Sequence, residues 1–177
     1  MADVPWWSDS YPSQYYAYSN TSAKICGYPS VGWIDVSMFS SAPTWLPAAA
    51  DMIALTEAEW SARSLVNQAV KDGAVVTYTP SAAITLSGAS TATAGTALTL
   101  TVSLNGTGPA SAVTITLSDG SAGGKFSSDD LTFDEAGATT QTVTYTPAAA
   151  GTVTISTTNT GGLTNPDSWS ITVSAAS

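Results

Sequence analysis

Leu98-Thr-Leu-Thr-Val-Ser-Leu104 is the stretch that decides the fold of the second half of this chain. Its apolar residues alternate with threonine and serine, so every second side chain lies on the same side of an extended backbone. A strand of this kind buries one face and exposes the other, which is typical of antiparallel sheets. The same alternation recurs along the chain at residues 84–86, 113–117, 143–145, 153–155 and 169–173.

Turn-forming pairs separate these apolar runs. They are built from glycine, proline, asparagine, aspartate and alanine, and they stand at residues 94–95, 105–106, 108–109, 119–120, 123–124, 161–162 and 165–166. About seven short strands at such regular spacing are the pattern of a two-sheet β-sandwich. We therefore predict a mainly β protein in which residues 80–177 form one sandwich domain.

Five segments within residues 82–175 share a composition rich in glycine, threonine and valine. They are Gly95-Thr-Ala-Leu-Thr-Leu-Thr-Val102, Val113-Thr-Ile-Thr-Leu-Ser-Asp-Gly120, Gly124-Lys-Phe-Ser127, Val143-Thr-Tyr-Thr-Pro147 and Gly151-Thr-Val-Thr-Ile-Ser156. Together they resemble the immunoglobulin-like domains of bacteria and phages, and the resemblance implies an immunoglobulin-like sandwich. The chain departs from antibody domains because it has no cysteine pair and no tryptophan on the third strand. Apolar packing alone is expected to stabilise this domain.

The first half of the chain has a different composition. Five of the six tryptophans and six of the seven tyrosines precede residue 80, and Pro80-Ser-Ala-Ala83 marks a short linker. We therefore predict a separate aromatic-rich docking module over residues 1–79. Its fold is expected to be a small irregular α+β module, with residues 1–50 irregular apart from short strands.

Three local patterns define the elements expected in this module. Tyr15-Tyr-Ala-Tyr18 favours a strand with one aromatic face, and Thr56-Glu-Ala-Glu59 matches a capping box that starts a short helix from Glu57 to about Val66. Asp72-Gly73 lies between two apolar runs, which indicates a β-hairpin. The alternative is a helix that continues to Lys71 and stops at Gly73; Val75, Val76 and Tyr78 favour the hairpin.

Further segments within residues 15–79 belong to a second pattern. They are Tyr16-Ala-Tyr-Ser19, Gly32-Trp-Ile-Asp35, Leu46-Pro47, Ile53-Ala-Leu-Thr-Glu-Ala-Glu-Trp60 and Val70-Lys-Asp-Gly-Ala-Val-Val-Thr-Tyr-Thr79. They resemble a small module of phage tail-fibre assembly and tail-associated proteins, in which a proline, a spacer and Leu-Thr-x-x-Glu precede an Asp-Gly hairpin. The sandwich that follows is a departure from a pure assembly chaperone.

Composition excludes several function classes. The net charge is −9 and the four basic residues are scattered, whereas nucleic-acid binding and binding to anionic membranes need clustered lysine or arginine. The chain has no histidine, which removes the commonest general base and the usual nucleophile systems. No Walker-type glycine loop, secretory leader or long apolar run is present. We predict no enzyme activity, no cofactor and no membrane insertion.

Two minor site candidates remain. Asp129, Asp130, Asp134 and Glu135 are interpreted first as solvated loop charges, second as a weak cation site and last as catalytic carboxylates. Cys26 is the single cysteine and is interpreted as a buried apolar residue, with an intermolecular disulfide as the alternative.

The main site prediction is a docking interface. Six aromatic rings crowd the first eighteen residues: Trp6, Trp7, Tyr11, Tyr15, Tyr16 and Tyr18. Aromatic residues are enriched at interface hot spots because they bury a large area at low entropic cost. We expect these rings to pack against a neighbouring subunit; the alternative is a local core with scattered surface tyrosines.

These observations lead to a non-enzymatic phage virion accessory protein as the first hypothesis. Its location would be the virion, as a capsid decoration, head fibre or tail-associated protein, and its partner a phage capsid or tail structural protein, with several copies on each particle. The displayed domain could bind a cell-surface glycan weakly. The alternatives are a tail-fibre assembly chaperone in the host cytoplasm and a bacterial surface carbohydrate-binding module.

Overall fold

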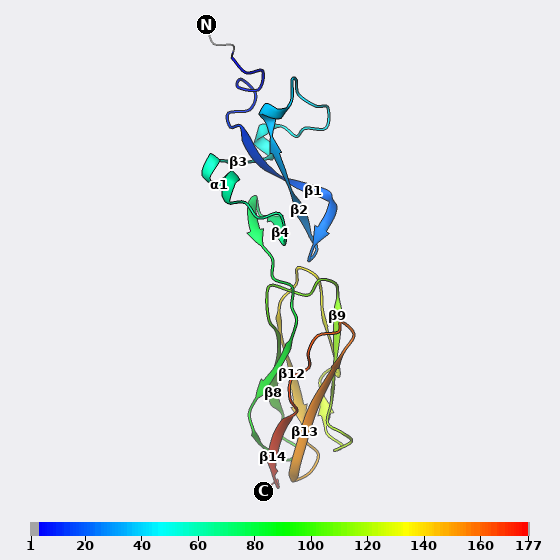
Figure 1. Cartoon of the computed structure of the whole chain (residues 1–177). Coiled ribbons are helices and arrows are strands. Elements are labelled where there is room, and N and C mark those ends of the chain that lie inside the picture. Colours follow the sequence, from blue (N-terminus) through cyan, green and yellow to red (C-terminus); the bar gives the residue numbers. More distant parts are fainter. Residues whose placement is uncertain (1–3, 177) are drawn as a thin grey trace. The chain divides into compact units, whose positions relative to one another are not determined.

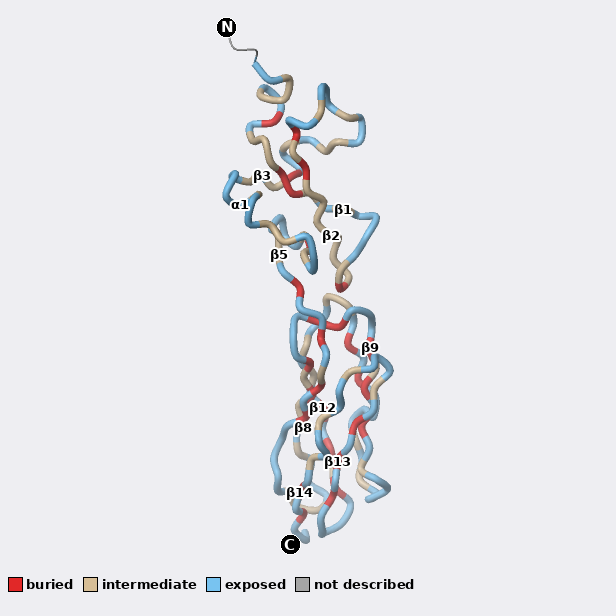
Figure 2. Tube along the Cα trace, viewed as in Figure 1, coloured by how far each residue is buried: buried red, intermediate tan, exposed pale blue. Residues whose placement is uncertain are grey.

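The computed structural model describes residues 4–176. Their contacts divide the chain into two compact units, Met1–Tyr78 and Thr79–Ser177, which we call the N-terminal and C-terminal units. Figure 1 shows that both are built mainly from strands, and Figure 2 shows that each encloses buried residues of its own. The chain is thus mainly β, with three sheets and one short α-helix among its described residues.

A five-stranded sheet organises the N-terminal unit, with strand order β3-β1-β2-β4-β5 and antiparallel pairing throughout. Its elements are β1 (Tyr15–Ile25), β2 (Tyr28–Asp35), the 3₁₀ turns η1 (Val36–Met38) and η2 (Ala49–Asp51), β3 (Ile53–Leu55), α1 (Glu57–Ala62), β4 (Gln68–Lys71) and β5 (Ala74–Thr77). The expectation of an irregular α+β module with short strands over residues 1–50 was therefore wrong. One connected sheet forms this unit.

The long β1–β2 hairpin is the element that the sequence analysis missed. Its turn consists of Cys26 and Gly27, which both have positive φ angles of 47° and 80°. Such a turn usually contains asparagine or aspartate before glycine, so a cysteine in the first position conceals it. A register shift between Asn20 and Lys24 further breaks the alternation along β1. The predicted strand at residues 15–18 is confirmed as the start of β1.

The other local predictions for this unit are confirmed, with one change of length. Thr56 and Glu59 form both hydrogen bonds of the capping box, and these bonds lower the pKa of Glu59. The helix ends at Ala62 rather than near Val66, because Arg63 turns to an extended backbone at φ −60° and ψ 140°. Asp72 and Gly73 have φ angles of 50° and 75° and join β4 to β5 as the predicted hairpin.

Two facing sheets form the C-terminal unit, which has an immunoglobulin-like β-sandwich architecture. One sheet has the order β10-β12-β8-β6 and the other β11-β9-β13-β14-β7, with β7 parallel to β14. The strands are β6 (Ile84–Gly88), β7 (Thr91–Thr93), β8 (Leu98–Leu104), β9 (Val113–Ser118), β10 (Lys125–Phe126), β11 (Asp130–Phe133), β12 (Thr140–Thr146), β13 (Gly151–Asn159) and β14 (Trp169–Ser174). Within residues 79–176 there are nine strands instead of about seven; β7, β10 and β11 lie outside the runs predicted from alternation, and β7 and β10 are too short to show it.

The core of the C-terminal unit follows the alternation seen in the sequence. Leu100, Val102 and Leu104 of β8 are buried, whereas the intervening residues keep contact with solvent. The same holds for the inward residues of the other long strands, so the two sheets enclose one continuous apolar cluster. The outer faces are left with threonine and serine, which are compatible with a pleated surface and carry no charge.

A hydrogen-bonded clamp closes one end of this sandwich. The Tyr145 hydroxyl, on a fully buried side chain, donates to Asp119 Oδ2 at 3.0 Å, and the same oxygen accepts the Gly124 amide at 2.9 Å. Asp119 Oδ1 also accepts the Ser121 amide at 3.1 Å. A Cβ atom on Gly124 would collide with the Tyr145 ring and hydroxyl, so this close approach requires glycine. Burial first, and then Asp119, raises the pKa of Tyr145 to about 12.

Candidate docking surface of the N-terminal unit

The aromatic rings predicted as a docking interface are divided between the interior and the surface of the N-terminal unit. Tyr11 and Tyr16 are 7% and 1% exposed and belong to the unit's own core, with Ile34, Val36 and Met52. Trp6 and Trp7 are half-buried and pack against this cluster. Only rings that keep exposed area can contact a partner, so Tyr11 and Tyr16 are excluded from a direct role.

Polar and edge-on contacts fix these rings in place. Trp6 packs edge-on against Tyr11 at 6.1 Å between centroids, and Tyr11 against Tyr16 at 6.0 Å. The Trp6 indole donates to the carbonyl of Phe39 at 2.5 Å, which ties the first residues to the segment after β2. The aromatic terminus is therefore built into the fold and supports the surface segment that Phe39 begins.

Tyr15 is occupied by an intramolecular stack. Its ring lies 4.9 Å from the ring of Trp60 with an interplanar angle of 19°, and the Arg63 guanidinium lies 3.6 Å from the Trp60 centroid. Trp60 thus contacts both the Tyr15 ring and the Arg63 guanidinium. The Tyr15–Trp60 stack connects α1 to β1.

The most exposed aromatic surface lies in a segment that the sequence analysis did not single out. Residues 36–50 contain no charged side chain, yet Met38 is 80% exposed and Trp45 is 57% exposed. Trp45 packs edge-on against Phe39 at 6.0 Å and lies 6.5 Å from Tyr18. We call Tyr18, Phe39 and Trp45, together with the exposed Met38 that precedes Phe39 in the chain, the Trp45 patch. A sequence signal existed in the long uncharged run with Pro43 and Pro47 on either side of Trp45.

Tyr18 supports this patch through an unusual cross-strand contact. Its partner on β2 is Gly32, and a Cβ atom at that position would collide with the Tyr18 ring. The ring therefore lies across the glycine backbone, where no other residue leaves enough space. Tyr18 also lines a recess of about 260 Å³ between β1, β3 and the β4–β5 hairpin, together with Asp51, Met52 and Ile53.

The charges of the N-terminal unit are distributed unevenly around the patch. Asp9 belongs to the turn that holds Trp6, Asp35 directly precedes η1, and Asp51 lines the recess beside Tyr18. Of the three basic side chains of this unit, Arg63 lies 3.6 Å from the Trp60 ring, Lys71 lies 4.9 Å from the ring centroid of Tyr28, and Lys24 stands six positions beyond Tyr18 along β1. Asp35 is satisfied internally, as its carboxylate accepts hydrogen bonds from Gln14 and Ser37.

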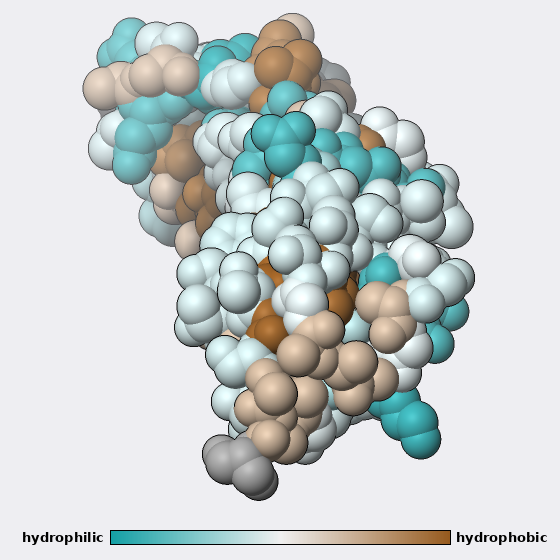
Figure 3. All heavy atoms as spheres, turned by 90° about the horizontal axis from the view of Figure 1, so that it is seen from below, coloured by the Kyte–Doolittle hydropathy of each residue, from teal (hydrophilic) through white to brown (hydrophobic). Residues whose placement is uncertain are grey.

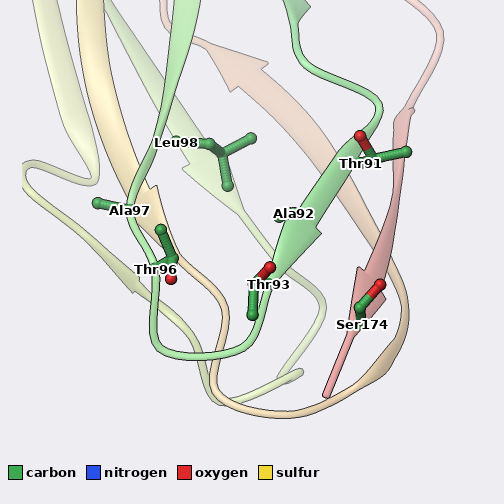
Figure 4. Close-up of a pocket in the computed structure, with 7 residues that line it drawn as sticks. All are labelled: Thr91, Ala92, Thr93, Thr96, Ala97, Leu98 and Ser174. Atoms are coloured by element: carbon green, nitrogen blue, oxygen red, sulfur yellow. The ribbon is translucent and has the colours of Figure 1, made fainter. Parts of the chain in front are cut away.

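The C-terminal unit has a larger hollow with a different character. It has a volume of about 390 Å³ and lies between β7 and the start of β8 (Figure 4), where hydroxyls of Thr91, Thr93 and Ser174 line one side. Its lining contains neither an aromatic nor a charged side chain. Figure 3 shows this end of the unit as mostly pale and tan residues with a few apolar atoms visible in recesses. The hollow lacks the groups that would recognise a specific ligand.

The remaining predicted site residues do not converge. Asp129 and Asp130 stand at one end of β11, whereas Asp134 and Glu135 follow its other end. A strand advances about 3.3 Å per residue, so its length separates the two pairs, and residues 4–176 contain no group of three acidic, histidine or cysteine side chains able to hold a metal ion. Cys26 is buried beside Ala69 and Tyr78, as its apolar interpretation expected.

No protein-family model matches the chain, and no curated protein matches it by sequence. Among solved structures, the CARDB domain of a Pyrococcus furiosus protein, in complex with di-metal ions, is similar with a TM-score of 0.40 and 14% identity, over 54% of this chain and 93% of that chain. Domains 4 and 5 of the S-layer protein SbsC are similar with a TM-score of 0.31 and 20% identity, over 52% of this chain and 51% of that chain.

Within the described residues, no helix has the length and apolar character that a membrane span requires. The one α-helix has six residues, whereas a span needs about 20.

Proposed function

We propose that this chain is a non-enzymatic phage virion accessory protein. The N-terminal unit anchors it to a capsid or tail structural protein. The immunoglobulin-like unit is displayed on the particle surface and can contact a host-surface glycan weakly. The resemblance of residues 15–79 to tail-associated modules and of residues 82–175 to phage immunoglobulin-like domains supports this proposal. Several copies on one particle would make even weak contacts effective through avidity.

One observation supports the division of roles most directly. The large hydrophobic side chains that remain exposed among residues 4–176 all belong to the N-terminal unit: Val4, Met38, Trp45, Leu65 and Val66. Exposed apolar side chains cost solubility unless they serve a contact. The C-terminal unit instead buries its apolar side chains and exposes hydroxyls, which suits a surface that faces solvent.

The glycan role of the displayed unit rests on few side chains. Phe133 and Tyr145 are fully buried, and Phe126 and Trp169 are half-buried against the core. The Trp169 indole donates to the carbonyl of Ala89 at 3.2 Å, which holds it within its own unit. Sugar rings usually stack on exposed aromatic faces, so any contact with glycans is expected to be weak.

The proposal is tested with virions that lack this protein. These particles are mixed with the full-length chain or with residues 79–177 and then sedimented. We expect the full-length chain to sediment with particles and the C-terminal unit alone to stay in solution. Equal binding of the two would place the anchor in the sandwich, and sedimentation of neither would refute a virion role.

A tail-fibre assembly chaperone is the second candidate, favoured by the resemblance of residues 15–79. The two roles differ in stoichiometry, because a chaperone leaves the finished particle. Quantitative mass spectrometry of purified virions separates them: an accessory protein is present at a fixed ratio to the capsid or tail protein, whereas a chaperone is absent.

A further inference from the structure

We propose that the Trp45 patch is the surface through which the N-terminal unit docks, and that its partner presents an apolar socket rimmed by lysine or arginine. This inference rests on the proposed function and moves the contact to the 36–50 segment, with Tyr18 retained from the six rings that the sequence predicted. It commits to a protein partner with a basic rim, and a second copy of this chain or a glycan are alternatives that the experiment below distinguishes.

The shape and composition of the patch match those of an interface hot spot. Tryptophan and methionine are enriched at protein interfaces, and their energetic contribution is largest where the side chain is held before binding. Trp45 is held in this way, because Phe39 packs edge-on against it and Leu46 donates to the Pro43 carbonyl at 3.1 Å, closing a turn around it. Binding therefore costs little further side-chain entropy. Trp45 and Met38 still have most of their surface area to bury against a partner.

The charged residues near the Trp45 patch indicate which kind of partner surface it favours. Asp51 lines the recess beside Tyr18, and Asp9 follows Trp6, whose indole donates to the Phe39 carbonyl, by three positions in the chain. Both carboxylates are exposed to solvent and remain available for contact with a partner. A partner with lysine or arginine around its socket gains attraction at the rim, where such charges steer association.

The same charges disfavour a second copy as the occupant. Pairing two identical patches would bring the Asp9 and Asp51 carboxylates of both copies toward one another, and like charges across an interface are unfavourable. The net charge of −9 adds repulsion between whole chains. A heterologous basic partner avoids both costs.

The test uses the full-length chain, virions lacking it and sedimentation. The double variant Met38→Ser/Trp45→Ser removes the patch, and Thr21→Ser/Ala23→Ser is the control, since Thr21 and Ala23 are exposed positions of β1 in the same unit and lie outside the set of exposed apolar side chains. We expect the patch variant to lose at least tenfold in affinity and the control to stay within twofold. Circular dichroism and the urea midpoint confirm that both variants remain folded.

Two further arms test the partner's chemistry. Wild-type binding should weaken as salt is raised, Asp51→Asn should reduce that salt dependence, and a zero-length carbodiimide should cross-link the chain to lysines of one virion protein. If wild type binds and the patch variant binds equally, the inference fails while the virion role stands. Salt-independent binding, competition by free host polysaccharide, or a dimer in solution that the patch variant abolishes would each overturn it. If wild type does not sediment, the proposed function fails and the inference with it.

Discussion

Raising the pH above 10 should destabilise the C-terminal unit through one side chain, Tyr145. Its phenol has an ordinary pKa of 10.0, which rises to about 12 in the folded protein, because burial and the hydrogen bond to Asp119 disfavour the phenolate. Between these values the unfolded chain releases a proton that the folded chain retains. The stabilisation is therefore complete below pH 10 and is lost as the pH rises through about 12.

The magnitude follows from the size of the shift. One pKa unit corresponds to about 1.4 kcal/mol, so a rise of this size sets an upper bound of about 3 kcal/mol. Asp119 is only half-buried, and solvent screening reduces its share of the shift. We expect a loss of about 1–2 kcal/mol across the alkaline window, which is a measurable part of the stability of a domain of this size.

The assay compares the wild-type chain with Tyr145→Phe. Urea unfolding midpoints, followed by the fluorescence of Trp169 in residues 79–177, should fall more steeply with alkaline pH for wild type than for the variant. Difference absorbance between the two proteins reports the phenolate directly, since Tyr145 is the only tyrosine after residue 80. Near neutral pH the variant should be less stable by about 1 kcal/mol, because the hydroxyl–carboxylate bond is lost. Identical alkaline slopes, or titration of this phenol at its ordinary pKa, would refute the reasoning.

Three further perturbations test other parts of the structure. Gly124→Ala should destabilise the C-terminal unit by more than about 1 kcal/mol, since the new methyl group collides with Tyr145; an unchanged urea midpoint would contradict the clamp. Gly32→Ala should displace the Tyr18 ring, detected as altered near-ultraviolet circular dichroism of the N-terminal unit, whereas Gly73→Ala, which meets no atom within 4 Å, changes only backbone strain. Acidification should loosen the start of α1, because the lowered pKa of Glu59 stabilises the fold above its ordinary value of 4.5 and this contribution is lost as the pH falls through the folded value. The protection factor of the Thr56 amide, corrected for intrinsic exchange, should fall on acidification in wild type and already be low in Glu59→Ala; an unchanged protection factor at all pH values would argue against the capping box.

The C-terminal unit could be predicted from its sequence because one simple rule governs it. Apolar residues alternate with threonine and serine along β8 and at Val153 and Ile155 of β13, and the structure packs these apolar residues into a single cluster between two sheets. Strands β7 and β10 escaped prediction because two or three residues cannot display a period of two. Their pairing is set by neighbouring strands rather than by their own composition.

The sheet of the N-terminal unit was not predicted because its core is built from aromatic rings and the turn of its longest hairpin is chemically atypical. The Cys26-Gly27 turn has neither asparagine nor aspartate before its glycine, so its composition did not indicate a hairpin. Crowded rings near Tyr11 suggested excess surface, yet edge-on packing lets a few large side chains fill one small cluster. Exposure of Trp45 depends on how the 36–50 segment folds back on Phe39, which is a tertiary property.

The two units bury their apolar side chains in different ways, and this difference indicates which unit carries the docking surface. In the C-terminal unit small alternating side chains fill the core, and removing a well-packed one such as Leu100 would cost about 2–5 kcal/mol. That arrangement leaves no large apolar group outside. In the N-terminal unit a sheet with only three-residue and four-residue edge strands cannot enclose every ring, so Trp45 and Met38 remain outside. Polar residues at both positions would cost the core little, since Met38 and Trp45 lie outside the buried cluster of this unit. The proposed partner would cover both side chains, which gives a reason for apolar residues at these exposed positions.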